Sequence, residues 1–381
     1  MRFLYLFIIT LLFSSCSQED NRIIPTVQTF TKLSTATTGI TFNNEIQETQ
    51  TRNHFLWPSI YNGGGVGVCD INNDGLLDIM MTKTFGNDEL YLNKGGMQFE
   101  NISVKAGIQG NPNNVSSGIS FGDVNQDGYK DIYVSVFGSS DKPEDKLNRL
   151  YINNGDLTFT ESAAALGVQS GGFTIQSAFI DFDLDGDEDL YVMNQPSNVR
   201  TVKQRYKDEG EAKFTNPMTT DRLYRNDGGK YTDVSKAAGI EKFAYGLGIK
   251  VQDINIDGYP DIYIANDYDK PDFMYINNQK GGFVNMIDDA VNHISNFSMG
   301  VDISDINNDG LVDIGVLDMA GANHYRSKTN MPSMSPKQFY KNVDDGLHYQ
   351  YMHNTLQLNN GNNTFSDIAY LAGMAKTDWS W

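Results

Sequence analysis

Asp253-Ile254-Asn255-Ile256-Asp257-Gly258-Tyr259-Pro260-Asp261 is one of five copies of a nine-residue pattern, D-x-[DN]-x-D-G-x-x-D. The first Asp residues of successive copies lie 52 to 72 positions apart. The copies run from Asp70 to Asp78, Asp123 to Asp131, Asp181 to Asp189, Asp253 to Asp261 and Asp305 to Asp313. A pattern that recurs at such intervals predicts a repeat architecture in which each unit is one small supersecondary structure.

The residues on both sides of each copy predict strands. Short runs of small, apolar and alternating residues, such as 118–122 and 261–265, precede and follow the pattern, which indicates strand, loop, strand. A second hairpin follows in each unit, with Asn at the end of its first strand and an aromatic residue in the returning strand. The Asn residues are Asn93, Asn153, Asn226, Asn277 and Asn359, and the aromatic residues are Phe99, Phe159, Tyr231, Phe283 and Phe365. Four strands in about 50 residues are typical of a β-propeller blade, although a β-sandwich array or a solenoid could use the same hairpins.

The two ends of the chain are out of phase with this repeat, which favours the propeller. Residues 30–40 (FTKLSTATTGI) match the closing segment 231–240 (YTDVSKAAGI), so we expect the chain to begin with the last strand of a blade. The spacing after Asn359 places the next copy of the pattern just past Trp381. We therefore predict an all-β propeller over residues 27–381, with five metal-loop blades and a truncated C-terminus.

The five patterns predict calcium loops. Side chains at positions one, three, five and nine and the backbone carbonyl of position seven would converge on one point, and Gly at position six allows the sharp turn. Hard oxygen ligands in a short flexible loop suit Ca²⁺ better than Mg²⁺ or Zn²⁺. The predicted ligands are Asp70, Asn72, Asp74, Leu76 and Asp78; Asp123, Asn125, Asp127, Tyr129 and Asp131; Asp181, Asp183, Asp185, Asp187 and Asp189; Asp253, Asn255, Asp257, Tyr259 and Asp261; and Asp305, Asn307, Asp309, Leu311 and Asp313.

The obvious rival for this pattern is an EF-hand, which requires Glu at position twelve and flanking helices. Position twelve is apolar in all five copies, so the sequence excludes the EF-hand; it holds Met81, Val134, Val192, Ile264 and Val316. Without a cation each loop would crowd three or four carboxylates together, at a Coulomb cost of several kcal/mol. We therefore expect about five Ca²⁺ sites and a fold that depends on Ca²⁺ for part of its stability. The alternative is that the loops are Asp/Gly turns that bind no metal.

With these residues in view, the chain resembles the FG-GAP/VCBS repeat family, whose best-known fold is the propeller of the integrin α chain. The resemblance is closest to bacterial surface proteins whose propeller precedes an ASPIC/UnbV-type segment, related to cartilage acidic protein. It covers about residue 27 to the end. It implies structural Ca²⁺ in the blade loops, ligand recognition on the rim loops and, by analogy with integrin, seven blades in the complete ring. It implies no single ligand, because propellers serve many functions.

The N-terminus predicts export and lipidation. Arg2 and the short apolar run that follows it form a signal peptide over residues 1–15, and the run is too short to remain as a membrane-spanning helix. Phe13-Ser14-Ser15-Cys16 resembles a bacterial lipobox, so we expect a lipidated Cys16 and a polar tether over residues 16–26. An ordinary signal peptide with an incidental Cys is the alternative. This predicts an outer-membrane lipoprotein on the cell surface or on the periplasmic face, with no membrane contact besides the anchor.

The net charge excludes one class of partner, and the cysteine content excludes a disulfide framework. The net charge of −19 argues against nucleic acid, because phosphate binding needs a basic surface. Cys69 is the only other cysteine, so no disulfide framework is possible, and we expect it to be a small core residue.

We predict a binding or scaffolding module for a glycan or protein ligand at the cell surface, and no catalytic residues. Two insertions motivate this prediction: Asn194 to Asp221 is rich in charge, and Asp318 to Asn354 is rich in Tyr and His. Packing of these loops against the rim or a missing blade is an alternative role. The alternative function is a calcium-dependent polysaccharide lyase or glycosidase. No free acid pair, G-x-S-x-G or H-E-x-x-H motif favours an enzyme. The five His residues, at positions 54, 293, 324, 348 and 353, show no metal-binding spacing.

Overall fold

The computed structural model describes residues 30–55, 60–137, 143–196, 218–240, 243–268, 270–329 and 335–379. The predicted signal peptide, Cys16 and the tether lie outside the described residues, as does most of the insertion from Asn194 to Asp221. None of the helices in the described ranges is both long and apolar enough to span a bilayer.

The chain forms an all-β propeller of four-stranded antiparallel blades. Blade 1 contains β1 (Val66–Cys69), β2 (Asp78–Met81), β3 (Glu89–Asn93) and β4 (Phe99–Asn101). Blade 2 contains β5 (Val115–Gly122), β6 (Asp131–Phe137), β7 (Arg149–Asn153) and β8 (Phe159–Glu161). Blade 3 contains β9 (Thr174–Ile180), β10 (Asp189–Asn194), β11 (Arg222–Asn226) and β12 (Tyr231–Asp233). Blade 4 contains β13 (Gly246–Gln252), β14 (Asp261–Asn266), β15 (Phe273–Asn277) and β16 (Phe283–Asn285). Blade 5 contains β18 (Gly300–Ser304), β19 (Asp313–Leu317), β21 (Thr355–Asn359) and β22 (Phe365–Asp367).

The strand predictions are confirmed almost residue by residue. Every pattern copy connects the first strand of a blade to the second, which begins at the ninth-position Asp. Each third strand ends at the predicted hairpin Asn, and each fourth strand begins at the predicted aromatic residue.

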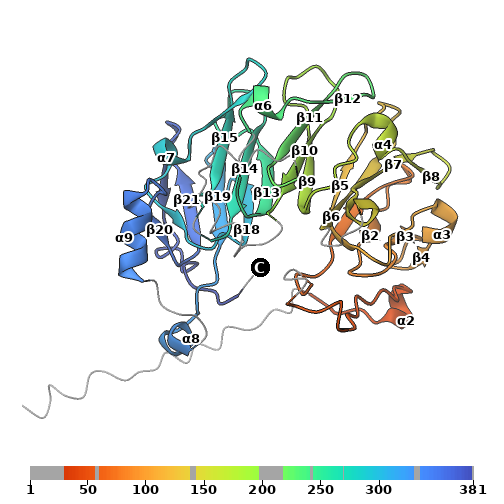
Figure 1. Ribbon diagram of the computed structural model, residues 1–381, viewed down its shortest axis with the longest axis horizontal. Coiled ribbons are helices and arrows are strands. Elements are labelled where there is room, and N and C mark those ends of the chain that lie inside the picture. The colour runs from red at the N-terminus through yellow and green to blue at the C-terminus, as the bar shows by residue number, and fades with distance from the viewer. Residues whose placement is uncertain are drawn as a thin grey trace, which may run out of the picture.

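The blades follow one another in chain order around an arc, with the C-terminal end near its centre (Figure 1). Neighbouring blades meet through their first strands, because β1 contacts β5, β5 contacts β9, β9 contacts β13 and β13 contacts β18. This arrangement gives the second strands of blades 2, 3 and 4 a neighbouring blade on both faces. Strand β6 is buried along its whole length as a result, and its side chains alternate between two different cores.

The cores lie between blades, where both faces are shielded from water. Ile71 and Met80 of blade 1 pack with Tyr151 and Phe159 of blade 2. Equivalent clusters fill the next three interfaces. The free face of blade 1 is different, because Val66 and Val68 are 66% and 53% exposed. Cys69, on the same strand, is only partly buried against the core, so the prediction that it is a core residue holds in part.

A short helix follows the last strand of each of the first four blades: α3 (Ser103–Ala106), α4 (Ala163–Leu166), α6 (Ser235–Ala238) and α7 (Ile287–Ala290). Helix α2 (Thr35–Thr38) repeats this element before blade 1. A Cβ added at Gly39 would lie 2.6 Å from the carbonyl oxygen of Phe99, and one at Gly107 would lie 3.2 Å from that of Phe159. Helix α2 therefore packs against the fourth strand of blade 1 in the same way that α3 packs against the fourth strand of blade 2. Residues 30–34 form no strand, because no third strand lies beside them in the described chain.

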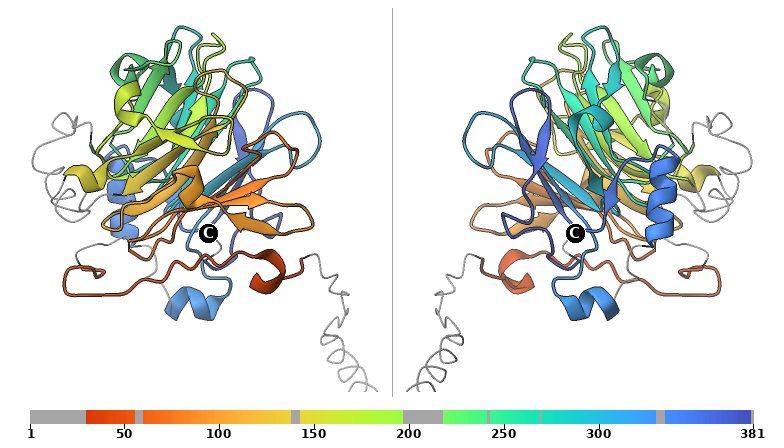
Figure 2. Two further views of the ribbon diagram at one scale, coloured as in Figure 1. Left: turned by 90° about the vertical axis from the view of Figure 1, so that its right-hand side faces the viewer. Right: turned by 90° about the vertical axis from the view of Figure 1, so that its left-hand side faces the viewer.

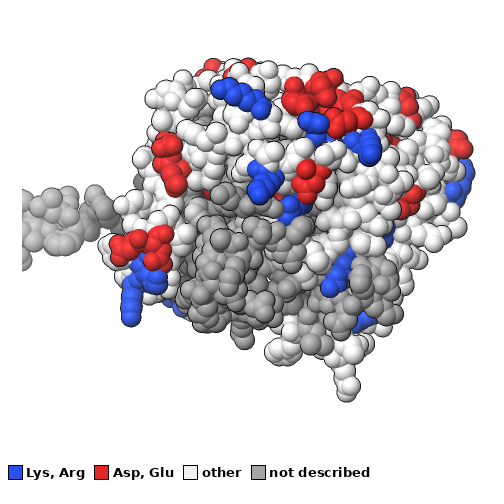
Figure 3. Space-filling model, turned by 45° about the horizontal axis from the view of Figure 1, so that its top comes forward, with Lys and Arg blue, Asp and Glu red and all other residues white. Residues whose placement is uncertain are grey.

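The insertion of blade 5 is more ordered than the sequence predicts. It contains helices α8 (His324–Thr329) and α9 (Pro336–Asp344) and strand β20 (Gln350–Tyr351). Strand β20 pairs in parallel with β17 (Ile294–Ser295), which lies before blade 5. Helices α2 and α8 lie on the same side of the blades (Figure 2). On the face drawn in Figure 3, Asp and Glu side chains gather in separate groups with Lys and Arg between them.

Candidate metal centres

The first Asp of each pattern is the centre around which its loop folds. In the fourth copy, Oδ1 of Asp253 accepts the N–H of Asp257 at 3.0 Å, and Oδ2 accepts the N–H of Gly258 at 2.9 Å. The same two hydrogen bonds occur in the other four copies. One carboxylate thus holds the reversal of the chain.

The side chains at positions three and five complete the loop. Oδ1 of Asp257 accepts the N–H of Tyr259 at 2.9 Å, and its Oδ2 accepts Nδ2 of Asn255 at 3.0 Å. Position seven donates its N–H to position five in every copy. The structure therefore gathers positions one, three and five of each predicted set. Ligation by these side chains and by the carbonyl of position seven stays a prediction.

The ninth-position Asp is buried and connects the loop to the blade. Oδ2 of Asp131 accepts the N–H of Val124 at 2.9 Å, and Oδ1 accepts the N–H of Asn153 at 2.7 Å. All five copies make both bonds. Burial raises the pKa of Asp131 to about 6, that of Asp189 to about 7 and that of Asp261 to about 6. A nearby cation would offset this cost of burying a carboxylate.

Two residues in each loop adopt left-handed backbone conformations. Gly at position six has φ between 82° and 94°, as its predicted role in the turn requires. Position four also has a positive φ, close to 60° in every copy, although it holds Leu184 in copy three and Ile256 in copy four. This second requirement was not predicted from the sequence, because Leu and Ile give no turn signal.

The third copy fits a cation best. Ligand atoms of Asp181, Asp183 and Asp189 all lie within 4.8 Å of one another. Oδ1 of Asp183 is buried and has no hydrogen-bond partner. Burial and the neighbouring Asp185 and Asp181 carboxylates raise the pKa of Asp183. An orphaned carboxylate oxygen facing two other carboxylates is unfavourable without a cation, so these residues fit Ca²⁺.

The pattern loop of one blade is bonded to the hairpin of the next blade. Nδ2 of Asn153 donates to the carbonyl of Ile71 at 2.8 Å, that of Asn226 to Val124 at 3.0 Å, and that of Asn277 to Phe182 at 2.7 Å. Each acceptor is the second residue of the preceding blade's pattern. The hairpin Asn, singled out in the sequence only as a turn residue, therefore couples neighbouring blades.

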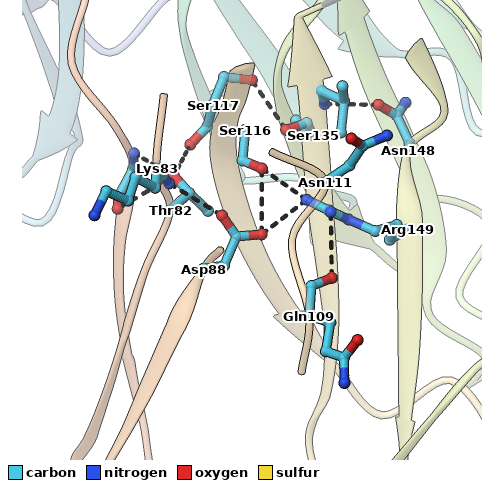
Figure 4. Close-up of polar contacts among 12 residues, drawn as sticks. Thr82, Lys83, Asp88, Gln109, Asn111, Ser116, Ser117, Ser135, Asn148 and Arg149 are labelled. Atoms are coloured by element: carbon cyan, nitrogen blue, oxygen red, sulfur yellow. Dashed lines mark hydrogen bonds and ion pairs between the residues drawn. The ribbon is translucent and has the colours of Figure 1, made fainter. Parts of the chain in front are cut away.

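A second set of acidic and amide side chains holds the opposite end of each blade. These residues directly precede the third strand and accept a backbone N–H from at or just past the end of the second; they are Asp88, Asn148, Asp221, Asp272 and Asn354. Figure 4 shows Asp88 between the backbone of Lys83 and the side chains of Ser116 and Arg149 of blade 2. Their recurrence five residues before each hairpin Asn was the sequence signal that could have revealed them.

Comparison with protein families identifies the repeat. An FG-GAP-like repeat matches residues 70–134, 136–192 and 253–316. The chain carries FG-GAP-like repeats. The first match contains pattern copies one and two, the second contains copy three, and the third contains copies four and five.

Relatives agree with this assignment. Mouse integrin alpha-8 is 33% identical over 34% of the chain and 13% of its own length. Human cartilage acidic protein 1 is 27% identical over 66% of the chain and 38% of its own length. The chain thus spans well under half the length of these relatives. The family resemblance predicted from the motifs is confirmed.

Solved structures give more distant matches. A lectin from Agrocybe aegerita, described as recognising non-reducing terminal N-acetylglucosamine, is 16% identical, with a TM-score of 0.41 over 80% of this chain and 65% of the lectin. The V. cholerae biofilm matrix protein Bap1 is 11% identical, with a TM-score of 0.37 over 80% of this chain and 38% of that protein.

Proposed function

We propose that the protein is a calcium-binding, lipid-anchored propeller that acts at the cell surface as a binding or scaffolding module for a glycan or protein ligand. The observation that carries the calcium part is the third loop, where the buried Oδ1 of Asp183 lacks a partner beside Asp181 and Asp189. Five loops with one hydrogen-bonding scheme support the same role for the other copies.

The calcium would be structural. The ninth-position Asp ties the loop to the hairpin of its own blade, and the hairpin Asn ties that hairpin to the preceding loop. A cation that neutralises the loop carboxylates would therefore stabilise the interfaces between blades as well as the loops themselves.

The insertion of blade 5 supports the binding role. Tyr325, Tyr340 and Tyr349 are 74%, 65% and 48% exposed, so they offer aromatic surface to a ligand. Phe339 contacts the rings of Tyr340 and Tyr349, which restricts these two side chains and lowers the entropic cost of binding through them. Rigid exposed aromatic rings stack on sugar faces and anchor protein interfaces equally well.

Thermal unfolding tests the calcium proposal most directly. The complete chain, purified in a mild detergent, is unfolded with millimolar Ca²⁺, with Mg²⁺ and with EGTA. We expect the midpoint to rise with Ca²⁺ and much less with Mg²⁺. Elemental analysis after dialysis gives the number of bound ions.

The variant Asp183→Ala sharpens this test, because its effect should change sign with calcium. In EGTA it removes a carboxylate that is crowded by those of Asp181 and Asp185 and whose buried Oδ1 has no hydrogen-bond partner, so the midpoint should rise. In Ca²⁺ it removes a ligand, so the gain from Ca²⁺ should be smaller. Asp289→Ala, an exposed carboxylate outside the loops, is the matched control and should do neither. An equal effect of Asp183→Ala in both buffers would contradict calcium binding at this loop.

Retention on glycan or protein arrays, compared with Tyr340→Ala and Tyr349→Ala, tests the binding role. Turnover of a uronate polysaccharide by the purified protein would instead favour the lyase or glycosidase alternative.

A further inference from the structure

Two histidines and one aspartate that belong to no FG-GAP-like loop lie together in blade 5. Nε2 of His293 is 3.0 Å from Oδ2 of Asp367, and Nδ1 of His353 is 3.9 Å from the same oxygen. Ligand atoms of the three residues all lie within 4.8 Å of one another. The three residues are far apart in the sequence, so no short motif announces them.

The insertion of blade 5 brings the two histidines together. His293 directly precedes β17 and His353 follows β20 by two residues, and these strands pair in parallel with Ile294 opposite Gln350. The N–H of Ile294 donates to the carbonyl of Tyr349 at 3.0 Å, and that of Asn296 donates to Tyr351 at 3.0 Å. The pairing places both imidazoles over the last strand of the blade, where Asp367 lies.

Comparison with blade 3 shows which oxygen of Asp367 bonds to the backbone and which one faces other side chains. Its Oδ1 accepts the N–H groups of Leu356 and Ala369 at 3.0 and 2.9 Å, a structural role that Asp233 shares in blade 3 through the N–H of Ser235. The Oδ2 atom of Asp233 faces the guanidinium of Arg222 at 3.5 Å.

In blade 5 the position of Arg222 is taken by Thr355, which begins the third strand and carries no charge. Two imidazoles occupy the space beside Oδ2 of Asp367 instead. One imidazole would suffice to pair with the carboxylate. The second adds a nitrogen donor that an ion pair does not need.

The environment is that of a three-ligand metal site. The side chains of Asp367 and His353 are 7% and 9% exposed, and that of His293 is 25% exposed, so the cluster is enclosed with one side open to solvent. Nδ1 of His353 lies 2.7 Å from the carbonyl oxygen of Asn354. Nδ1 is also the nitrogen that lies 3.9 Å from Asp367, so metal binding through it requires the tautomer in which Nε2 carries the proton, and the contact with this carbonyl is then given up.

We propose that His293, His353 and Asp367 bind a transition-metal dication such as Zn²⁺, with solvent in the fourth position. Two imidazole nitrogens and one carboxylate oxygen suit Zn²⁺ or Co²⁺, whereas the oxygen-only loops suit Ca²⁺. The site would tie the insertion, which carries the exposed tyrosines, to the last strand of blade 5. It is independent of calcium binding by the loops.

Cobalt spectroscopy tests the proposal. The complete chain is purified in detergent without a histidine tag, stripped with EDTA, loaded with excess Ca²⁺ and titrated with Co²⁺. We expect the visible absorption of a four-coordinate cobalt site, saturating at one ion per chain and displaced by Zn²⁺. Cobalt bound by oxygen ligands of the loops would absorb far more weakly.

Variants locate the site. His353→Gln and His293→Ala should each lower cobalt affinity at least about 10-fold, while His324→Ala, an exposed histidine in the same insertion, should leave it unchanged. Unfolding in Ca²⁺ checks that each variant is folded. Absence of this absorption in the folded wild-type protein, or equal affinity in folded His353→Gln and wild type, would overturn the proposal and leave only a histidine–aspartate ion pair.

Discussion

The second residue of each pattern offers a matched pair of substitutions that tests the packing between blades. Ile71 is 2% exposed and packs into the core between blades 1 and 2. Ile306 occupies the same position in copy five and is 49% exposed. Both residues donate their N–H to the ninth-position carboxylate, at 3.0 and 3.2 Å. Ile71→Ala and Ile306→Ala therefore remove the same atoms from the same local backbone, and only the surroundings differ.

The expected difference follows from burial. Ile71→Ala removes about three buried carbons at about 0.8 kcal/mol each, and a cavity term brings the cost to about 3 to 4 kcal/mol. Ile306→Ala removes the same carbons from a half-exposed site and leaves no closed cavity, so its cost should be about 1 kcal/mol or less. The free energy of unfolding should fall by at least about 2 kcal/mol more for Ile71→Ala than for Ile306→Ala.

Urea unfolding of the 381-residue chain in saturating Ca²⁺, followed by circular dichroism, measures both costs. The Ca²⁺ keeps the loops in one state, so the comparison reports packing alone. Equal losses for the two variants would refute the reasoning, because they would mean that the motif itself, and not its burial between blades, determines the stability of this position.

Three further predictions use the repeat in the same way. Arg149 lies 2.8 Å from the fully buried carboxylate of Asp88, so Arg149→Ala leaves that carboxylate without its cation and should lower the free energy of unfolding by about 3 to 5 kcal/mol. Lys94 pairs with Glu100 at the surface, so Lys94→Ala should lower it by about 0.5 kcal/mol or less in the same urea assay. Burial raises the pKa of Asp272 to about 7, so the folded protein binds this proton more tightly than the unfolded chain, and its contribution to stability should fall as pH rises from about 4 to about 7 and then level off. Asp272→Asn, which copies the amide of blades 2 and 5, should flatten that part of a stability–pH profile; an unchanged slope would contradict the assignment. Ile256 has φ 59°, a conformation in which Asn is less strained than Ile, and copies one and five already have Asn at this position. Ile256→Asn should therefore raise the unfolding free energy by about 1 kcal/mol; a loss of stability would show that strain at this position is unimportant.

The strands and the loops were predictable because their signals are local and repeated. Alternation around each pattern fixed the first two strands, and the hairpin Asn and the aromatic residue fixed the other two. Helices α8 and α9 were not predicted, because the insertion that contains them carries no motif that repeats in the other blades. The exposure of Val66 and Val68 was not predicted either, since alternation cannot tell whether a neighbour covers a given face.

The candidate sites also differ in whether their residues are close in the sequence or are brought together only by the fold. Positions one, three and five of each nine-residue pattern are close in sequence, so their meeting follows from the turn alone. Asp367 and His293 come from different segments, and their meeting depends on the parallel pairing of β17 with β20. Asp88 belongs to a recurrent set, five residues before each hairpin Asn, and was therefore detectable. Its partner Arg149 belongs to the next blade, and only the packing of the two sheets brings them together.

The hydrogen bonds at the two ends of a blade explain why a loop cation would act beyond its own loop. In blade 2 the hairpin of β6 and β7 is held at one end by Asp131 and at the other by Asn148. The Asp131 end is also bonded through Asn153 to the loop of blade 1, and the Asn148 end reaches Thr174 of blade 3. Removing a cation from the second loop would leave Asp131 as a buried carboxylate with an elevated pKa, at the point where the hairpin meets the preceding blade. The cost would then be shared by two blades, so calcium loss should loosen the propeller at its interfaces before it unfolds any single sheet.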